Sequence, residues 1–179
     1  MTLPERLQPW SGPTLRHIPA GAHRDVLDFT YAGKSTENRW NVAGEPTLYL
    51  ASGSDVAVAE FGRHFREDRT ASLGAQTVER TVYRLTVALD AVLDLRDAAV
   101  WAALSLPNPP HCFLDREIAR ATARFVRATT AAQGLWVPSV AFLDDLTRGN
   151  LVVFLEKLPA NPTHFIPHVN VVGTFRWSG

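Results

Sequence analysis

Three residues with the chemistry needed to cleave a nucleotide lie close together in the sequence. Arg39 lies near the end of a polar segment, Tyr49 lies in an apolar run, and Glu60 lies in the segment after that run. An arginine can hold phosphate bidentately, an aromatic ring can flank a base, and a carboxylate can stabilise a positively charged ribosyl transition state. Each residue also has an ordinary structural explanation, as a solvated loop arginine, a core tyrosine and a helix-start acid. The sequence therefore predicts a dinucleotide-cleaving site only if the fold brings the three together.

The elements that would position these residues can be predicted from local patterns. Residues 47–51 form a β-rich apolar strand, and a helix capped by Ser54 or Asp55 runs from there to about residue 66. Val58, Phe61 and Phe65 have helical spacing and form its expected core stripe, which leaves Glu60 to face elsewhere. Arg39 lies in the polar loop 32–41, where it is expected to contribute little to core packing.

The whole chain, residues 1–179, is predicted to form one domain of the α+β class. The first dozen residues are expected to form an irregular arm, and residues 114–133 the longest helix, capped by Gly134. A shorter helix is expected at 98–104. Further strands are expected at 15–18, 81–89, 92–95, 135–137, 151–156 and 169–177. Strands outnumber helices and do not alternate regularly with them, which favours α+β over a doubly wound sheet.

Several separated motifs, taken in order, resemble the RES-domain family, which is named for a shared arginine, glutamate and serine. The motifs are TLRHI (14–18), ENRWNVAGEPTLYLA (37–51), AVAE (57–60), PS (138–139) and GNLVVF (149–154). The resemblance spans about residues 15–154. It implies a fold similar to that of ADP-ribosylating toxins, with a mixed or antiparallel β core flanked by helices.

The resemblance also implies a function. RES-domain toxins degrade NAD, some of them by phosphorolysis to nicotinamide and ADP-ribose 1''-phosphate, and are silenced by a partner with an Xre-like helix-turn-helix. Hydrolysis of NAD, transfer of ADP-ribose to a protein, and an inactive antitoxin-binding module remain alternatives. NAD is then a substrate, inorganic phosphate a candidate co-substrate, and no bound cofactor or metal is expected.

Roles for individual residues follow from the same resemblance. Arg16 and Arg39 are expected to hold the pyrophosphate or an incoming phosphate, and Tyr49 to pack against the nicotinamide side of the ligand. Glu60 is expected to stabilise the charge that develops on the ribose. The resemblance further implies that Ser139 hydrogen-bonds the ligand and that Asn150 orders the loop around it.

One position departs from the family pattern. His17 stands where an aromatic residue, commonly tyrosine, follows the first arginine. Imidazole can still stack or donate a hydrogen bond, and its charge is expected to change near neutral pH. An ordinary surface histidine is the alternative.

The composition excludes several classes of protein. Lysine plus arginine equals aspartate plus glutamate at 18 each, so nothing favours nonspecific binding to nucleic acid or membranes. Cys112 is the single cysteine, which excludes an internal disulfide. No signal peptide or membrane span is apparent, and a cytoplasmic protein is expected.

Three further features are weaker candidates for functional sites. His164 and His168 have metal-like spacing but lack further clustered ligands, so zinc is not expected. His111 and Cys112 lie in a proline-broken stretch without an acidic partner, which argues against a cysteine nucleophile. The third feature is a basic stripe on the long helix, either a solvated face or a docking face for an acidic partner. Its members are Arg116, Arg120, Arg124 and Arg127.

Overall fold

A mixed six-stranded sheet forms the centre of the molecule. The computed structural model describes residues 2–22, 25–67 and 79–176. The strands are β1 (Gln8–Pro19), β2 (Thr47–Ala51), β3 (Arg80–Asp94), β4 (Gly134–Pro138), β5 (Gly149–Phe154) and β6 (His168–Phe175). The helices are α1 (Ser54–Glu67), α3 (Ala98–Ala103) and α4 (Arg116–Thr129), joined by the short 3-10 turns η1 (Pro4–Arg6), η2 (His111–Leu114), η3 (Leu155–Lys157) and η4 (Pro162–His164). The predicted α+β class is confirmed.

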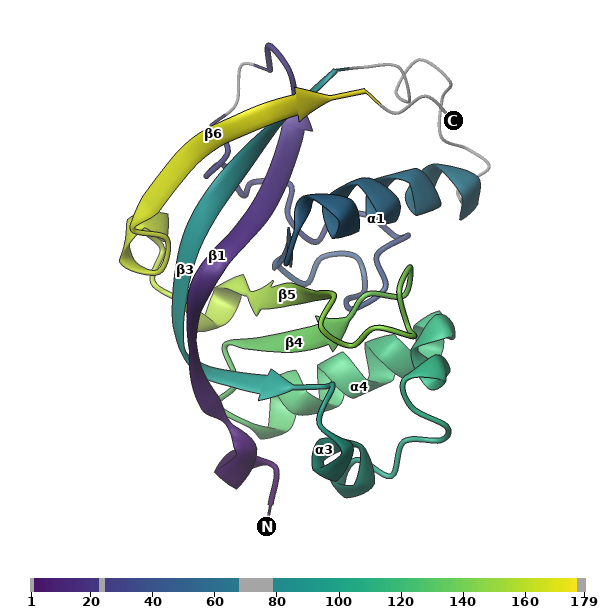
Figure 1. Cartoon of the computed structure of the whole chain (residues 1–179). Helices are drawn as coiled ribbons and strands as arrows, with labels where there is room; N and C mark the ends of the chain where they lie inside the picture. Colours follow the sequence, from purple (N-terminus) through teal and green to yellow (C-terminus); the bar gives the residue numbers. More distant parts are fainter. Residues whose placement is uncertain (1, 23–24, 68–78, 177–179) are drawn as a thin grey trace.

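The sheet closes on itself through its longest strands. The strand order is β1-β2-β5-β4-β3-β6, and β1 also pairs with β3 along almost its whole length. Every pairing is antiparallel except that between β3 and β4. Figure 1 shows β1, β3 and β6 as long curved strands side by side, with β4 and β5 running across below them. In the same view α4 lies beneath β4, and α1 lies above β5.

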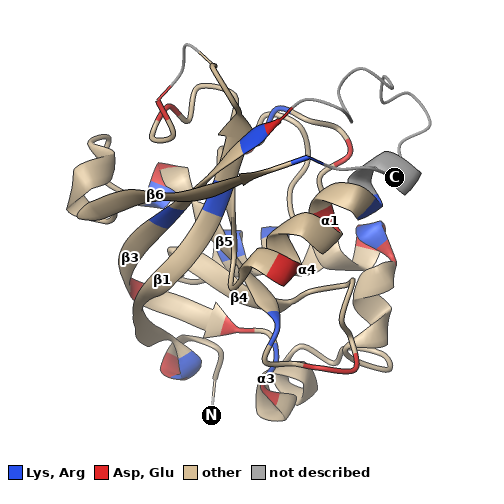
Figure 2. Ribbon diagram, turned by 45° about the horizontal axis from the view of Figure 1, so that its top comes forward, with Lys and Arg blue, Asp and Glu red and all other residues tan. Residues whose placement is uncertain are grey.

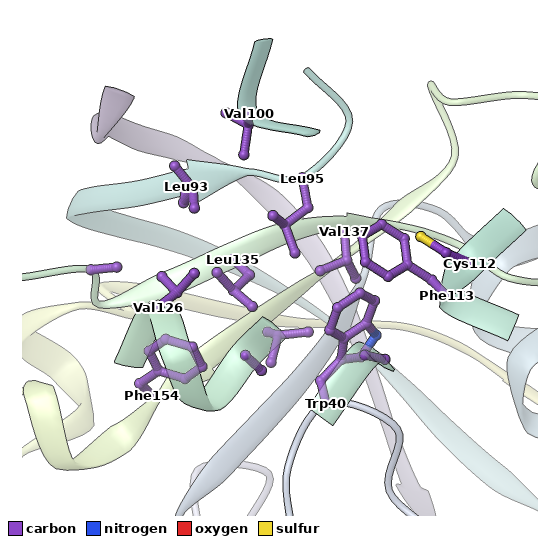
Figure 3. Packing of buried hydrophobic residues seen from close by; sticks show 14 residues of the cluster. Trp40, Leu93, Leu95, Val100, Cys112, Phe113, Val126, Leu135, Val137 and Phe154 are labelled. Carbon is purple, nitrogen blue, oxygen red and sulfur yellow. The ribbon is translucent and has the colours of Figure 1, made fainter. Parts of the chain in front are cut away.

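Two apolar clusters occupy the two faces of β4 and β5. Leu135 and Val152 belong to the helix-side cluster, which includes residues of α3, α4 and η2. Their immediate neighbours in the chain, Trp136 and Leu151, belong to the strand-side cluster with residues of β2 and β3. Adjacent residues of a strand point to opposite faces, so these two strands are buried on both sides. Figure 3 shows the helix-side cluster.

Several predicted boundaries were wrong. The expected irregular arm instead contains η1 and, from Gln8, the first part of β1, and Pro9 lies at a register shift where the ladder is interrupted. The expected strands at 81–89 and 92–95 are one strand, β3. The long helix ends at Thr129, and Gly134 begins β4 rather than capping the helix.

The buried face of α1 also differs from the predicted stripe. Val56 and Ala57 are its buried apolar residues, whereas Val58 and Phe61 are only half-buried. The side chain of Phe65 lies outside the described part of the structure. Glu60 follows Val56 by one turn and therefore lies on the inward face of the helix.

Candidate functional site

The carboxylate of Glu60 is held on both of its oxygens. Its Oε1 accepts hydrogen bonds from the Ser139 hydroxyl at 2.6 Å and from the Asn150 amide at 3.4 Å. The Nε of Arg63, one turn further along α1, lies 3.5 Å from Oε2. The Glu60 side chain is 26% exposed, so it is accessible from outside while its orientation is fixed.

Strand pairing explains why these residues meet. Asn150 near the start of β5 pairs with Ala51 at the end of β2 and with Val137 near the end of β4. Ser139 follows β4 directly, and α1 begins three residues after β2 ends. The ends of two strands and the start of a third thus gather at one edge of the sheet, beside the first turns of α1.

Two cavities meet at Glu60. We call the first, of 320 Å³, the central cavity; Arg16 and His17 lie in its wall. We call the second, of 200 Å³, the inner cavity; its wall includes Arg39, Arg63 and Arg116. The two cavities share four wall residues: Asn38, Tyr49, Glu60 and Asn150. A ligand reacting at Glu60 could therefore extend into both spaces, each of which carries arginine.

Tyr49 contributes its ring to both cavities and its hydroxyl to the loop behind them. The hydroxyl donates to Asn41 Oδ1 at 2.7 Å and accepts from the Trp40 amide at 3.0 Å. Burial raises the pKa of Tyr49, so the phenol stays protonated. The ring is therefore a fixed apolar wall, suited to packing against a flat heterocycle.

Arg39 is buried, contrary to the expectation of a loop arginine with little part in packing. Its side chain is 8% exposed, and Nη1 donates to the carbonyls of Phe113 and Leu114 at 2.8 and 2.7 Å. The next residue, Trp40, packs on the Phe113 ring with the ring centroids 4.9 Å apart (Figure 3). Asn41 is fully buried and donates to the Gly33 carbonyl. The Arg-Trp-Asn motif therefore anchors the loop, and Arg39 also lines the inner cavity.

Ser139 does not open into either cavity. The residue is 0% exposed, and its hydroxyl donates to Glu60 and accepts from the Ala141 amide at 3.3 Å. The expected hydrogen bond to the ligand stays a prediction. The geometry instead supports a positioning role, with Ser139 acting through the carboxylate.

Arg16 is a wall residue of the central cavity. Its Nη1 donates to the Val26 carbonyl, and its guanidinium lies 4.9 Å from the centroid of the Phe29 ring. Burial lowers the pKa of Arg16, while Asp28 and Asp25 raise it. A guanidinium carries five N–H donors in a planar fork, so this group can hold a phosphate as well as the backbone.

His17 is a neutral residue rather than a titrating one at neutral pH, which corrects the expectation from its ordinary pKa. Burial, aided by the nearby charges of Arg80 and Arg16, lowers the pKa of His17 to about 3. Its Nδ1 accepts a 2.7 Å hydrogen bond from Arg80, and its ring meets Phe61 edge-on at 4.9 Å. His17 therefore acts as a packed wall residue with a fixed tautomer.

Sequence reasoning missed several wall residues, among them the polar residues Asn38, Arg63 and Arg116. Arg63 could have been found, because residues three apart on a helix are neighbours and Glu60 had already been singled out. Arg116 had been assigned only to the basic stripe of α4. Asn38 stands directly before Arg39, and nothing in its residue type distinguished it from other loop residues.

Three of the four arginines of the stripe on α4 face the site loop rather than open solvent. Arg116 pairs with Glu37, and Arg120 donates to the carbonyls of Asn38 at 2.7 Å and Thr36 at 2.6 Å. Arg127 donates to Thr47 Oγ1 at 2.8 Å, and Arg124 lies 3.4 Å from Glu45. Arg116, Arg120 and Arg127 hold residues 36–47 against α4, whereas the Arg124 side chain is 62% exposed. Figure 2 shows positive and negative residues interspersed along the ribbon.

The structure gives less support to a cysteine nucleophile, a metal site or a membrane span. Burial raises the pKa of the Cys112 thiol, and the residue packs in the helix-side cluster, which makes it a poor nucleophile. Among the described residues no group of three His, Cys, Asp or Glu side chains is placed to hold a metal ion. None of the described helices is long and apolar enough to cross a bilayer.

Comparisons with known proteins place this arrangement in context. A family model described as the RES domain matches residues 14–177. A chain from the crystal structure of the M. tuberculosis MbcT–MbcA toxin–antitoxin complex has a similar fold, with a TM-score of 0.67 and 21% identity. The match covers 97% of this chain and 90% of that one. No curated protein matches the sequence.

Proposed function

The chain belongs to the RES-domain family, and from that premise we propose that it degrades NAD as the toxin of a toxin–antitoxin pair. The observation that carries the proposal is the Glu60 carboxylate, fixed on both oxygens at the junction of two cavities. The similar fold of a chain from a toxin–antitoxin complex supports the partner, which we propose to be an Xre-like helix-turn-helix antitoxin.

In the proposed reaction the bond between the ribose C1' and the nicotinamide nitrogen breaks. Nicotinamide leaves with the electron pair of that bond, and positive charge develops on the ribose. Glu60 lies where it can stabilise this charge, and its negative charge is worth most in a site that excludes water. Phosphate oxygen then forms the new bond to C1', giving ADP-ribose 1''-phosphate, or water attacks instead and gives ADP-ribose.

The other residues divide the remaining tasks. In this proposal Arg16 holds the pyrophosphate, and Tyr49 packs against the nicotinamide ring. Arg39 and Arg116 line the inner cavity, and this positive charge supports binding of an incoming anion there, with phosphate as the proposed acceptor. Ser139 and Asn150 hold the carboxylate in the orientation that the reaction requires.

The purified protein, free of any antitoxin, should consume NAD, and adding inorganic phosphate should redirect the product from ADP-ribose to its 1''-phosphate. Glu60→Gln should lower kcat by at least about a hundredfold with little change in the melting temperature.

Ser139→Ala should lower kcat by roughly tenfold with a smaller effect on KM, because the Ser139 hydroxyl acts through Glu60.

The fate of NAD and the effect of Glu60→Gln distinguish the proposed activity from its alternatives. NAD left intact at high protein concentration would refute the enzymatic proposal. Label from NAD that appears on a protein band, with little free product, would indicate ADP-ribosyl transfer. Growth arrest that survives Glu60→Gln would mean that catalysis is not the mechanism of toxicity.

A further inference from the structure

A third cavity continues the site away from Glu60. We call it the outer cavity; it measures 580 Å³, and Asp25 and Asp28 lie in its wall. It shares three residues, Arg16, Tyr31 and Ala32, with the central cavity. The three cavities therefore form a series, in which the outer cavity adjoins the central one at Arg16 and its neighbours, and the central cavity adjoins the inner one around Glu60.

This order matches the order of groups in a dinucleotide. With the reacting ribose at Glu60, a pyrophosphate extending through the central cavity reaches Arg16. The nucleoside beyond the pyrophosphate then has the outer cavity as the adjoining space. We propose that the outer cavity is the adenosine subsite of the enzyme; this assignment rests on the proposed cleavage of NAD.

The wall chemistry suits a neutral group that carries hydrogen-bond donors. Asp25 and Asp28 present carboxylate oxygens, which accept bonds from ribose hydroxyls and from an adenine amino group. Each aspartate also stabilises its own turn, since Asp25 accepts from the Leu27 amide at 2.9 Å and Asp28 from the Thr30 amide at 3.0 Å. The acceptors are thus held in place before a ligand arrives.

Tyr31 supplies an aromatic surface at the boundary between the outer and central cavities. The residue is 57% exposed, which is unusual for so large a ring, and Lys34 Nζ lies 4.6 Å from its ring centroid. Bases pack on such rings with little dependence on their identity. Tyr31 therefore offers a stacking surface at the boundary that the adenylate of a bound dinucleotide would reach beyond the pyrophosphate.

Equilibrium binding to the Glu60→Gln protein tests the assignment without turnover. The probes are NAD and nicotinamide mononucleotide, which lacks the adenylate. We expect NAD to bind at least about tenfold more tightly. Tyr31→Ala should reduce that ratio by about tenfold. Ala22→Trp, which fills the outer cavity from an exposed position, should reduce it as well.

Phe125→Ala is the matched control, because Phe125 is an exposed aromatic residue (51%) on α4 that lines none of the three cavities. It should leave the ratio unchanged. Equal affinities for the two probes, or a ratio that neither Tyr31→Ala nor Ala22→Trp alters, would overturn the adenosine assignment while leaving the proposed function standing. Failure of both probes to bind would overturn the proposed function, and the assignment with it.

Discussion

At the level of single residues, the Arg-Trp-Asn motif combines structural and chemical roles. Arg39 bonds two carbonyls of the segment before α4, and Asn41 bonds Gly33. Gly33 has a φ of +80°, and a Cβ there would lie 1.8 Å from the Glu45 carbonyl oxygen, so this close loop crossing requires glycine. The side chains that define the family motif therefore also build the loop that walls the cavities.

Arg39→Ala should destabilise the fold as well as weaken the site. The substitution leaves two carbonyls near the core without their charged donor, and we expect the free energy of unfolding to fall by roughly 2–4 kcal/mol. Urea unfolding measures this directly. Arg124→Ala, whose side chain is 62% exposed, is the control and should change stability by less than about 0.5 kcal/mol. An Arg39→Ala protein with an unchanged unfolding midpoint would contradict the structural role.

His17 should make stability depend on pH on the acid side of neutrality. In the unfolded chain His17 takes up a proton near its ordinary pKa of 6.5, but in the folded protein only near pH 3. Between these values the unfolded state binds more protons, so the free energy of unfolding falls as the pH falls. The contribution is at most about 1.4 kcal/mol per pH unit. His17→Gln removes this titration, and urea unfolding from pH 7.5 to 5 should show a shallower dependence; parallel profiles would refute the prediction.

At the level of elements, helix α4 is a support for the site loop. Arg120 reaches two loop carbonyls from a side chain that is only 17% exposed, whereas Arg124 makes an exposed contact to the same loop. Arg120→Ala should therefore loosen residues 36–38 and raise KM for NAD by about tenfold, with a smaller effect on kcat. Steady-state kinetics test this, with Arg124→Ala as the matched arginine control. Equal effects of the two substitutions would show that the loop does not depend on Arg120.

The sequence predicted elements best where a pattern is local. The strand at 47–51 and a helix that begins near residue 54 follow from a β-rich run and from residues typical of helix starts, and both are confirmed, although Ser54 and Asp55 are the first residues of α1 rather than its cap. The early part of β1 was missed because Pro9 and Pro13 argue against a strand, while pairing with β3 overrides them. Burial of Arg39 depends on contacts with residue 113, far along the chain, and no local pattern carries such information.

For the site as well, local motifs identified some residues, whereas other features depend on the fold. Residue types and family motifs pointed to Glu60, Tyr49 and Asn150, which the structure brings to one junction. That Ser139 lies behind the carboxylate, rather than in a cavity, depends on the path of the chain after β4. Its role as a positioning residue could therefore be inferred only from the fold.

At the level of the whole molecule, β4 and β5 couple the two apolar clusters. Leu135 packs in the helix-side cluster and Leu151 in the strand-side cluster, and both are fully buried. Their strands are paired, with Trp136 opposite Leu151 and Leu135 opposite Val152. Both clusters pack against the same two strands, so disruption of one cluster exposes strand residues on which the other cluster packs. The described sheet should therefore unfold as one unit.

This coupling predicts a single cooperative transition. Leu135→Ala and Leu151→Ala should each lower the free energy of unfolding by about 2–5 kcal/mol, because each leaves a cavity in a closely packed core. Urea unfolding followed by tryptophan fluorescence and by far-ultraviolet circular dichroism should give coincident midpoints in both variants, with the same dependence on urea concentration as the parent protein. A second transition that moves in one variant and stays fixed in the other would mean that the clusters unfold independently. In that case the cavity site, whose walls draw on residues of both clusters, would be lost with the less stable one.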